Sequence, residues 1–134
     1  MKWSDDYLTG IQNIDEHHKM LFRMSEDYRA ALGEGRGARV YGVLLESLDH
    51  YARAHFGVEE KCMAECQCPA AQQNSQAHGR FVEAIAQFQR RLKAQGFDEA
   101  DAWRLIEFVD NWLANHIGRI DVQLKQFAGH KTER

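Results

Sequence analysis

The stretch NSQAHGRFVEAIAQFQRRL, residues 74–92, decides the fold class of this chain. Its inward-facing positions recur in alternating steps of four and three residues: Asn74, His78, Phe81, Ile85, Phe88 and Leu92. Such a repeat follows one face of an α-helix, whereas a half-buried strand would alternate at every second residue. The sequence therefore predicts a helix here, closed by Gly96, with Asp98 as the N-cap of another helix.

Two segments before this stretch carry the same spacing. The first expected helix runs from about Ile14 to Leu32, and the glycine-rich run at residues 33–37 ends it. The second begins near Ala38 and ends before Pro69, the only proline of the chain. We expect Pro69 in the first turn of the third helix, where a missing N–H does no harm.

The fourth helix should follow Asp98 and continue through His116. Four helices of roughly 20–27 residues with short loops pack as an antiparallel up-down-up-down bundle. The predicted class is therefore all-α, an antiparallel up-down-up-down four-helix bundle. A non-helical N-terminal arm with Trp3 and Tyr7 should lie across it.

Composition sets limits on function. The 134 residues suit a single domain spanning 1–134, and 44% apolar with 28% charged residues is ordinary for a soluble protein. A net charge of −3 gives no reason to expect a nucleic-acid partner. No apolar run has the length of a membrane span, and the first residues do not resemble a signal peptide, so we expect no membrane contact and a cytoplasmic location.

Histidine and carboxylate side chains fall on all four expected helices. His55 and Glu59 are four residues apart, which places both on one helical face. In an antiparallel bundle the whole set lies at one end: His18, His55, Glu59, His78, His116 and Asp121. Burying such groups unpaired would cost several kcal/mol each, so we expect a metal centre. Imidazole and carboxylate donors without an obvious thiolate favour iron or manganese.

The motifs around these residues resemble those of bacterial hemerythrins over nearly the whole chain. The matching segments are Ile14–Lys19 (IDEHHK), His55–Met63 (HFGVEEKCM), Pro69 with His78–Phe81 (HGRF), and Trp112–Ile117 (WLANHI) with Asp121. The resemblance implies two iron ions joined by an oxo or hydroxo bridge and by two carboxylates. It also implies reversible binding of O2, or of another small diatomic molecule or anion, at one iron.

The resemblance also implies a role for each residue. Glu59 and Asp121 correspond to the bridging carboxylates, and His18 and His55 to the pair on the iron that keeps an open position. His78 and His116 correspond to two of three histidines on the other iron. Independently of the resemblance, Trp112 and Leu113 lie one turn before His116 and should help wall the site.

The third histidine is expected one turn before His78, where this chain has Asn74. Asn74 could itself bind iron weakly, a water or a vacancy could take that position, or a nearby residue could substitute. A second open iron would favour oxidase or peroxidase chemistry over oxygen carriage.

Other candidate residues have smaller roles. Adjacent helical residues point about 100° apart, so only one of His17 and His18 can face the metal. The helical phase selects His18 and leaves His17 at the surface or behind a ligand. His50 and His130 should face solvent.

Three cysteines, Cys62, Cys66 and Cys68, are crowded into seven positions, which is a poor disulfide framework. We expect Cys62 to be buried as a small hydrophobe and the other two to be more exposed.

The leading functional prediction is a non-enzymatic O2-binding protein with a non-haem di-iron centre, used for storage, delivery or sensing. The alternatives are a di-iron oxidase, peroxidase or nitric-oxide-reducing enzyme on the same fold, and an iron-binding signalling module. The sequence does not identify a redox partner.

Overall fold

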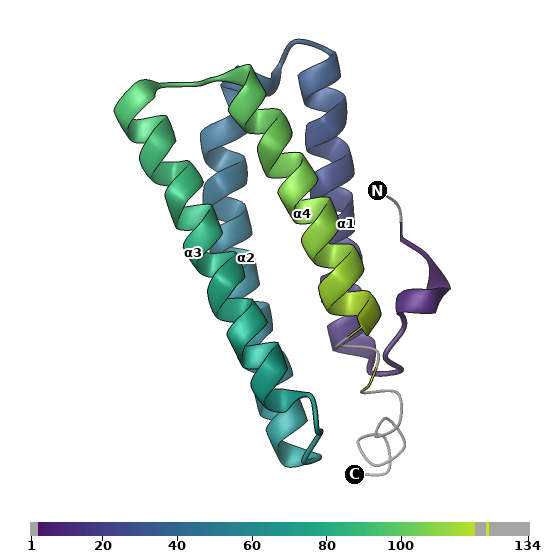
Figure 1. Ribbon diagram of the computed structural model, residues 1–134. Coiled ribbons are helices and arrows are strands. Elements are labelled where there is room, and N and C mark those ends of the chain that lie inside the picture. The colour runs from purple at the N-terminus through teal and green to yellow at the C-terminus, as the bar shows by residue number, and fades with distance from the viewer. Residues whose placement is uncertain (1–2, 120–122, 124–134) are drawn as a thin grey trace.

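The computed structural model describes residues 3–119 and 123. Within these residues the chain forms four long helices, α1 (Gln12–Gly33), α2 (Gly37–Glu65), α3 (Ala71–Gln95) and α4 (Glu99–Arg119), and a short 3-10 helix, η1 (Asp5–Tyr7). Successive helices run in opposite directions side by side, and the described residues contain no strand (Figure 1). The predicted all-α, up-down-up-down bundle is confirmed.

The loops follow from local chemistry at their ends. Gly96 ends α3 with a φ of 79°, a left-handed conformation that favours glycine, and its N–H donates to Leu92. Asp98 caps α4 as predicted, because its side chain accepts from the N–H of Ala100 at 3.3 Å. Between α1 and α2, Gly35 has a φ of 78°, a left-handed conformation that favours glycine and allows this tight turn.

Pro69 differs from its prediction. It lies in the turn between α2 and α3, two residues before Ala71, the first residue of α3. The α3 ladder begins where the N–H of Asn74 donates to the carbonyl of Ala70. Pro69 therefore helps to shape the turn and does not form the first turn of the helix.

The N-terminal arm lies across the bundle as predicted, but it is not wholly non-helical because it contains η1. The rings of Trp3 and Tyr7 pack against Phe22 of α1, with centroid separations of 5.6 and 5.2 Å. Tyr7 also contacts α4 beside Gly118. The arm thus closes the side of the bundle between α1 and α4.

A buried carboxylate fixes the junction between this arm and α1. Asp15, 5% exposed, accepts hydrogen bonds from the N–H and the hydroxyl of Thr9, both at 2.8 Å, and from the N–H of Gly10 at 3.1 Å. Three donors on one buried carboxylate hold the first turn of α1 in place. This turn comes directly before His18.

The predicted inward positions of the helices form the core. Apolar side chains from all four helices make one large cluster, and a smaller cluster of Ile14, Cys62, Met63, Cys68, Ala70 and Ala77 fills the end where α2 turns into α3. Halfway up, Asp110 of α4 accepts from the Ser25 hydroxyl at 2.6 Å and pairs with Arg29 of α1. Packing and this polar link fix the relative positions of α1 and α4.

Candidate metal centre

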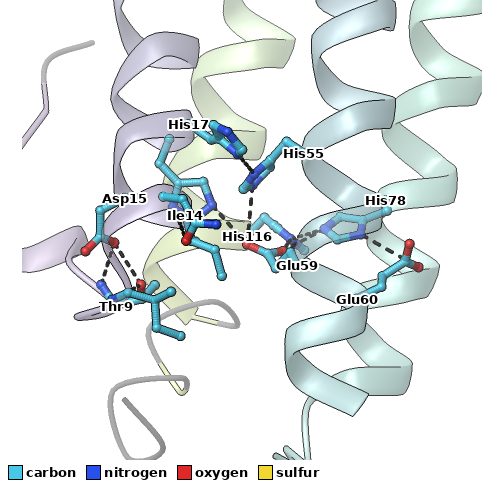
Figure 2. A network of polar contacts seen from close by, with 12 residues as sticks. Thr9, Ile14, Asp15, His17, His55, Glu59, Glu60, His78 and His116 are labelled. Carbon is cyan, nitrogen blue, oxygen red and sulfur yellow. Dashed lines mark hydrogen bonds and ion pairs between the residues drawn. The ribbon is translucent and has the colours of Figure 1, made fainter. Parts of the chain in front are cut away.

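Five polar residues meet inside one end of the bundle. His18 comes from α1, His55 and Glu59 from α2, His78 from α3 and His116 from α4. None of the five is more than 3% exposed. Figure 2 shows His55, His78 and His116 gathered around Glu59. The structure therefore brings together five of the seven predicted ligands at one level.

Each oxygen of Glu59 faces a different pair of imidazoles. Its Oε2 lies 3.0 Å from Nε2 of His18 and 3.4 Å from Nε2 of His55. Its Oε1 lies 2.9 Å from Nε2 of His78 and 3.6 Å from Nε2 of His116. The four imidazoles thus present the same ring nitrogen to a single carboxylate, two on either side.

The protonation of Glu59 reflects this setting. Burial alone would raise the pKa of Glu59, but contacts with His116, His18, His55 and His78 lower it, and the net pKa lies well below its ordinary value. Glu59 is therefore an anion at neutral pH, although it is fully buried. An anion at this depth needs cationic partners, either protonated imidazoles or bound metal.

The donor set fits a pair of metal ions. Two groups of three donors, His18–His55–Glu59 and Glu59–His78–His116, each have ligand atoms within 4.8 Å of one another, and they share Glu59. Two imidazoles and a carboxylate are the donors of many non-haem iron sites. The Nε2 atoms of His78 and His116 are 3.1 Å apart, so at least one of them offers a lone pair to the other.

Asn74 is a buried amide whose hydrogen-bonding atoms are not satisfied by any of the described residues. It is 0% exposed, and within residues 3–119 and 123 neither its Oδ1 nor its Nδ2 has a hydrogen-bond partner. It lies one turn before His78 on the inward face of α3. Leaving an amide unpaired at such depth costs on the order of 1–3 kcal/mol. A ligand role for Asn74 would remove part of this cost, and it stays a prediction.

The predicted ligand Asp121 lies outside the described residues, as does His130. His50 is exposed on α2, as predicted.

Aromatic rings cover two of the histidines. Trp112 stacks on His116 with a centroid separation of 4.2 Å and an interplanar angle of 19°. Phe56 stacks on His78 at 3.8 Å and 6°. Leu113 is fully buried in the same core. The contact of Phe56 with His78 could not be predicted from the sequence, because a helical repeat does not reveal contacts between helices.

His17 stands directly behind one of the histidines. Its Nδ1 lies 2.9 Å from Nδ1 of His55 (Figure 2). Its ring also meets the rings of His55 and Tyr51 edge to face. Burial lowers the pKa of His17, as does the neighbouring His18, while Glu59 acts in the opposite direction. Of the two predicted locations for His17, the structure selects the one behind a candidate ligand.

The cysteines differ from prediction at one position. Cys62 is buried, as expected, and Cys66 is half-buried. Cys68 was expected to be exposed but is only 4% exposed. Its N–H donates to the carbonyl of Met63 at 2.9 Å, which folds the loop back under the bundle and places Cys68 in the smaller apolar cluster.

Comparison with known proteins agrees with this arrangement. A model of the family described as the hemerythrin HHE cation binding domain matches residues 9–128, a range that includes all the predicted ligands. The chain is 31% identical over 134 residues to a bacteriohemerythrin of Stenotrophomonas maltophilia, covering 94% of this chain and 85% of that protein. It is 30% identical over 119 residues to a bacteriohemerythrin of Pseudomonas aeruginosa, covering 89% and 75%. It is also 26% identical over 123 residues to a myohemerythrin of Riftia pachyptila, covering 92% and 89%.

Proposed function

Because this chain belongs to the hemerythrin family, we propose that it binds O2 at a non-haem di-iron centre and serves in oxygen storage, delivery or sensing. The observation that carries the proposal is the position of Glu59, with one oxygen toward His18 and His55 and the other toward His78 and His116. A carboxylate placed in this way suits a bridge between two ions.

The residues would share the two irons as follows. His18 and His55 would hold one iron, His78 and His116 the other, and Glu59 would bridge them. By resemblance, Asp121 would supply the second carboxylate bridge, beside an oxo or hydroxo group. Such a centre supplies reversible binding of O2 or of another small diatomic molecule or anion.

Aromatic and apolar side chains around the ligands would limit the access of water to the site and hold its histidines in place. The rings of Phe56 and Trp112 lie flat against His78 and His116, and Leu113 is fully buried nearby. A hydrophobic shell of this kind limits solvent access and so affects the redox potential of a bound metal. His17 contacts the outer nitrogen of His55 and so helps to set its orientation.

The relatives named bacteriohemerythrin and myohemerythrin support a role as a binding protein and not as an enzyme. We further propose that residues 1–134 form one hemerythrin-like domain in the cytoplasm, with no nucleic-acid partner. No helix in the described part of the chain is long and apolar enough to cross a membrane.

Asn74 favours a second candidate function, an oxidase, peroxidase or nitric-oxide-reducing enzyme on the same fold. Asn74 offers a weak amide donor in place of a third histidine. Among the described residues, each half of the site then has the same strong donors, namely two imidazoles and one oxygen of Glu59. Both irons would then keep a position open to a small molecule. An iron with an open position would react with O2 more readily than one with a full ligand set, and with a reductant to return it to the ferrous state it would suit turnover better than carriage.

An absorption spectrum tests the two functions against each other. The purified chain is loaded with ferrous iron without oxygen, exposed to air, and then returned to oxygen-free buffer. A spectral change that appears in air and disappears on deoxygenation is expected for an oxygen binder. A change that persists supports the enzyme, and the absence of any change contradicts both functions.

A further inference from the structure

A pocket of about 370 Å³ lies between α3 and α4, next to the Glu59–His78–His116 half of the cluster. Its lining includes Arg80, Phe108, Asn111, Trp112, Asn115 and His116. This volume is at the lower end of the range for pockets that hold small organic molecules. It is much larger than O2 or another diatomic molecule requires.

The charge of the pocket favours an anion. Among the described residues that line it, Arg80 is the only arginine or lysine, and none is a carboxylate. Among the described residues no ion pair or hydrogen bond of the Arg80 side chain is found, whereas Arg29, Arg53 and Arg91 are paired with carboxylates. An unpaired guanidinium is suited to hold a carboxylate with two parallel hydrogen bonds.

The remaining lining favours a flat, partly apolar molecule. The indole of Trp112 is held from both sides, since its N–H donates to the carbonyl of Ala77 at 3.4 Å and its ring stacks on His116. Phe108 adds a second aromatic surface. The amide of Asn115 is oriented by a hydrogen bond to the carbonyl of Asn111 at 2.9 Å. Fixed rings with a few polar groups at the edge are typical of sites for planar ligands.

We propose that this pocket binds a small planar organic anion, with its carboxylate on Arg80 and its ring against Trp112 and Phe108. The bound anion would lie beside His116, which lines the pocket and whose Nε2 is 3.6 Å from Oε1 of Glu59. The site would therefore link a second ligand, an organic one, to the proposed metal centre. The proposed anchors of the anion, Arg80, Trp112 and Phe108, are not metal donors, so the proposal goes beyond the proposed O2 site and does not depend on it.

Calorimetric titration of the iron-loaded full chain with benzoate, and with its neutral counterpart benzamide, tests this proposal. We expect benzoate to bind and benzamide to bind more weakly. Arg80→Gln should weaken benzoate binding about three- to fivefold, as expected for a partly solvated ion pair, and should remove the difference between the two probes. Asn111→Trp, which fills the pocket from an exposed position, should abolish binding of both.

Arg23→Gln is the matched control, because Arg23 is an exposed arginine on α1 that does not line the pocket. It should bind benzoate as the parent does. The proposal is overturned if benzoate does not bind, or if Arg80→Gln and Asn111→Trp bind it as tightly as the control. The iron content of the same samples distinguishes failure of the anion-site proposal from failure of the proposed di-iron function. A chain that binds benzoate but no iron contradicts only the di-iron function.

Discussion

Replacing His17 with leucine should weaken iron binding, although His17 is not a proposed ligand. His55 lies between two groups, with Nε2 at 3.4 Å from Glu59 and Nδ1 at 2.9 Å from Nδ1 of His17. If Nε2 of His55 gives its lone pair to iron, the ring proton sits on Nδ1 and is donated to the bare Nδ1 of His17. Leucine removes this acceptor.

The size of the effect follows from this one contact. A neutral hydrogen bond contributes about 1 kcal/mol net, which corresponds to roughly a fivefold change in affinity. Loss of a group that orients a metal-bound histidine typically costs about 10- to 100-fold. The expected loss for His17→Leu therefore lies between about fivefold and 100-fold. His17→Gln should recover most of it, because the amide oxygen can accept the same proton.

The rate at which iron passes from the protein to a coloured chelator measures this effect. His50→Leu is the control, because it makes the same chemical change at an exposed histidine of α2. The absorption spectrum of the iron should shift in His17→Leu and return in His17→Gln. Equal release rates for His17→Leu and His50→Leu would refute the reasoning, and so would a glutamine variant that behaves like leucine.

Three other expectations follow from the site. Asn74→His should slow irreversible oxidation in air, since it adds a stronger donor than the amide; an unchanged decay of the absorption spectrum would make Asn74 a bystander. Removing iron should lower the melting temperature by more than about 5 °C, because buried donors lose their partner; equal melting temperatures would mean that hydrogen bonds alone satisfy the cluster. The stability of the iron-free chain should fall on acidification. Burial and the neighbouring His18 lower the pKa of His17 below 6.5, and contacts with four histidines lower the pKa of Glu59 below 4.5 despite its burial. Both groups therefore bind protons more readily in the unfolded chain, and added protons favour unfolding. Denaturant midpoints from about pH 7, above the ordinary pKa of histidine, down to about pH 3, below that of glutamate, measure this. A midpoint that rises on acidification contradicts it.

Most of the fold could be predicted because each helix carries a continuous inward stripe. The stripe through Phe81 and Ile85 and the cap at Asp98 depend only on residues close in sequence. The helical periodicity also predicted that His18, His55 and His116 lie at one level of the bundle, and this prediction required no knowledge of contacts between helices. Periodicity is sufficient when the relevant face of every helix points to one core.

The errors concern contacts that periodicity does not encode. Cys68 is buried because the loop after α2 folds back onto Met63, and this depends on the backbone path of a turn. The stacking of Phe56 on His78 and the contact of His17 with His55 depend on the rotation of one helix against another. The pocket beside Arg80 is formed by two helices together, so no single segment indicates it.

The central claim is that one carboxylate, Glu59, is shared by two irons. The direct test is the iron content of the purified chain from iron-replete cells, compared with Glu59→Gln and with Glu46→Gln as the control, since Glu46 is an exposed glutamate of the same helix. We expect about two irons in the parent and in the control, as in other di-iron bundles, and almost none in Glu59→Gln. A parent with a single iron, or a Glu59→Gln variant that keeps both, would contradict the account.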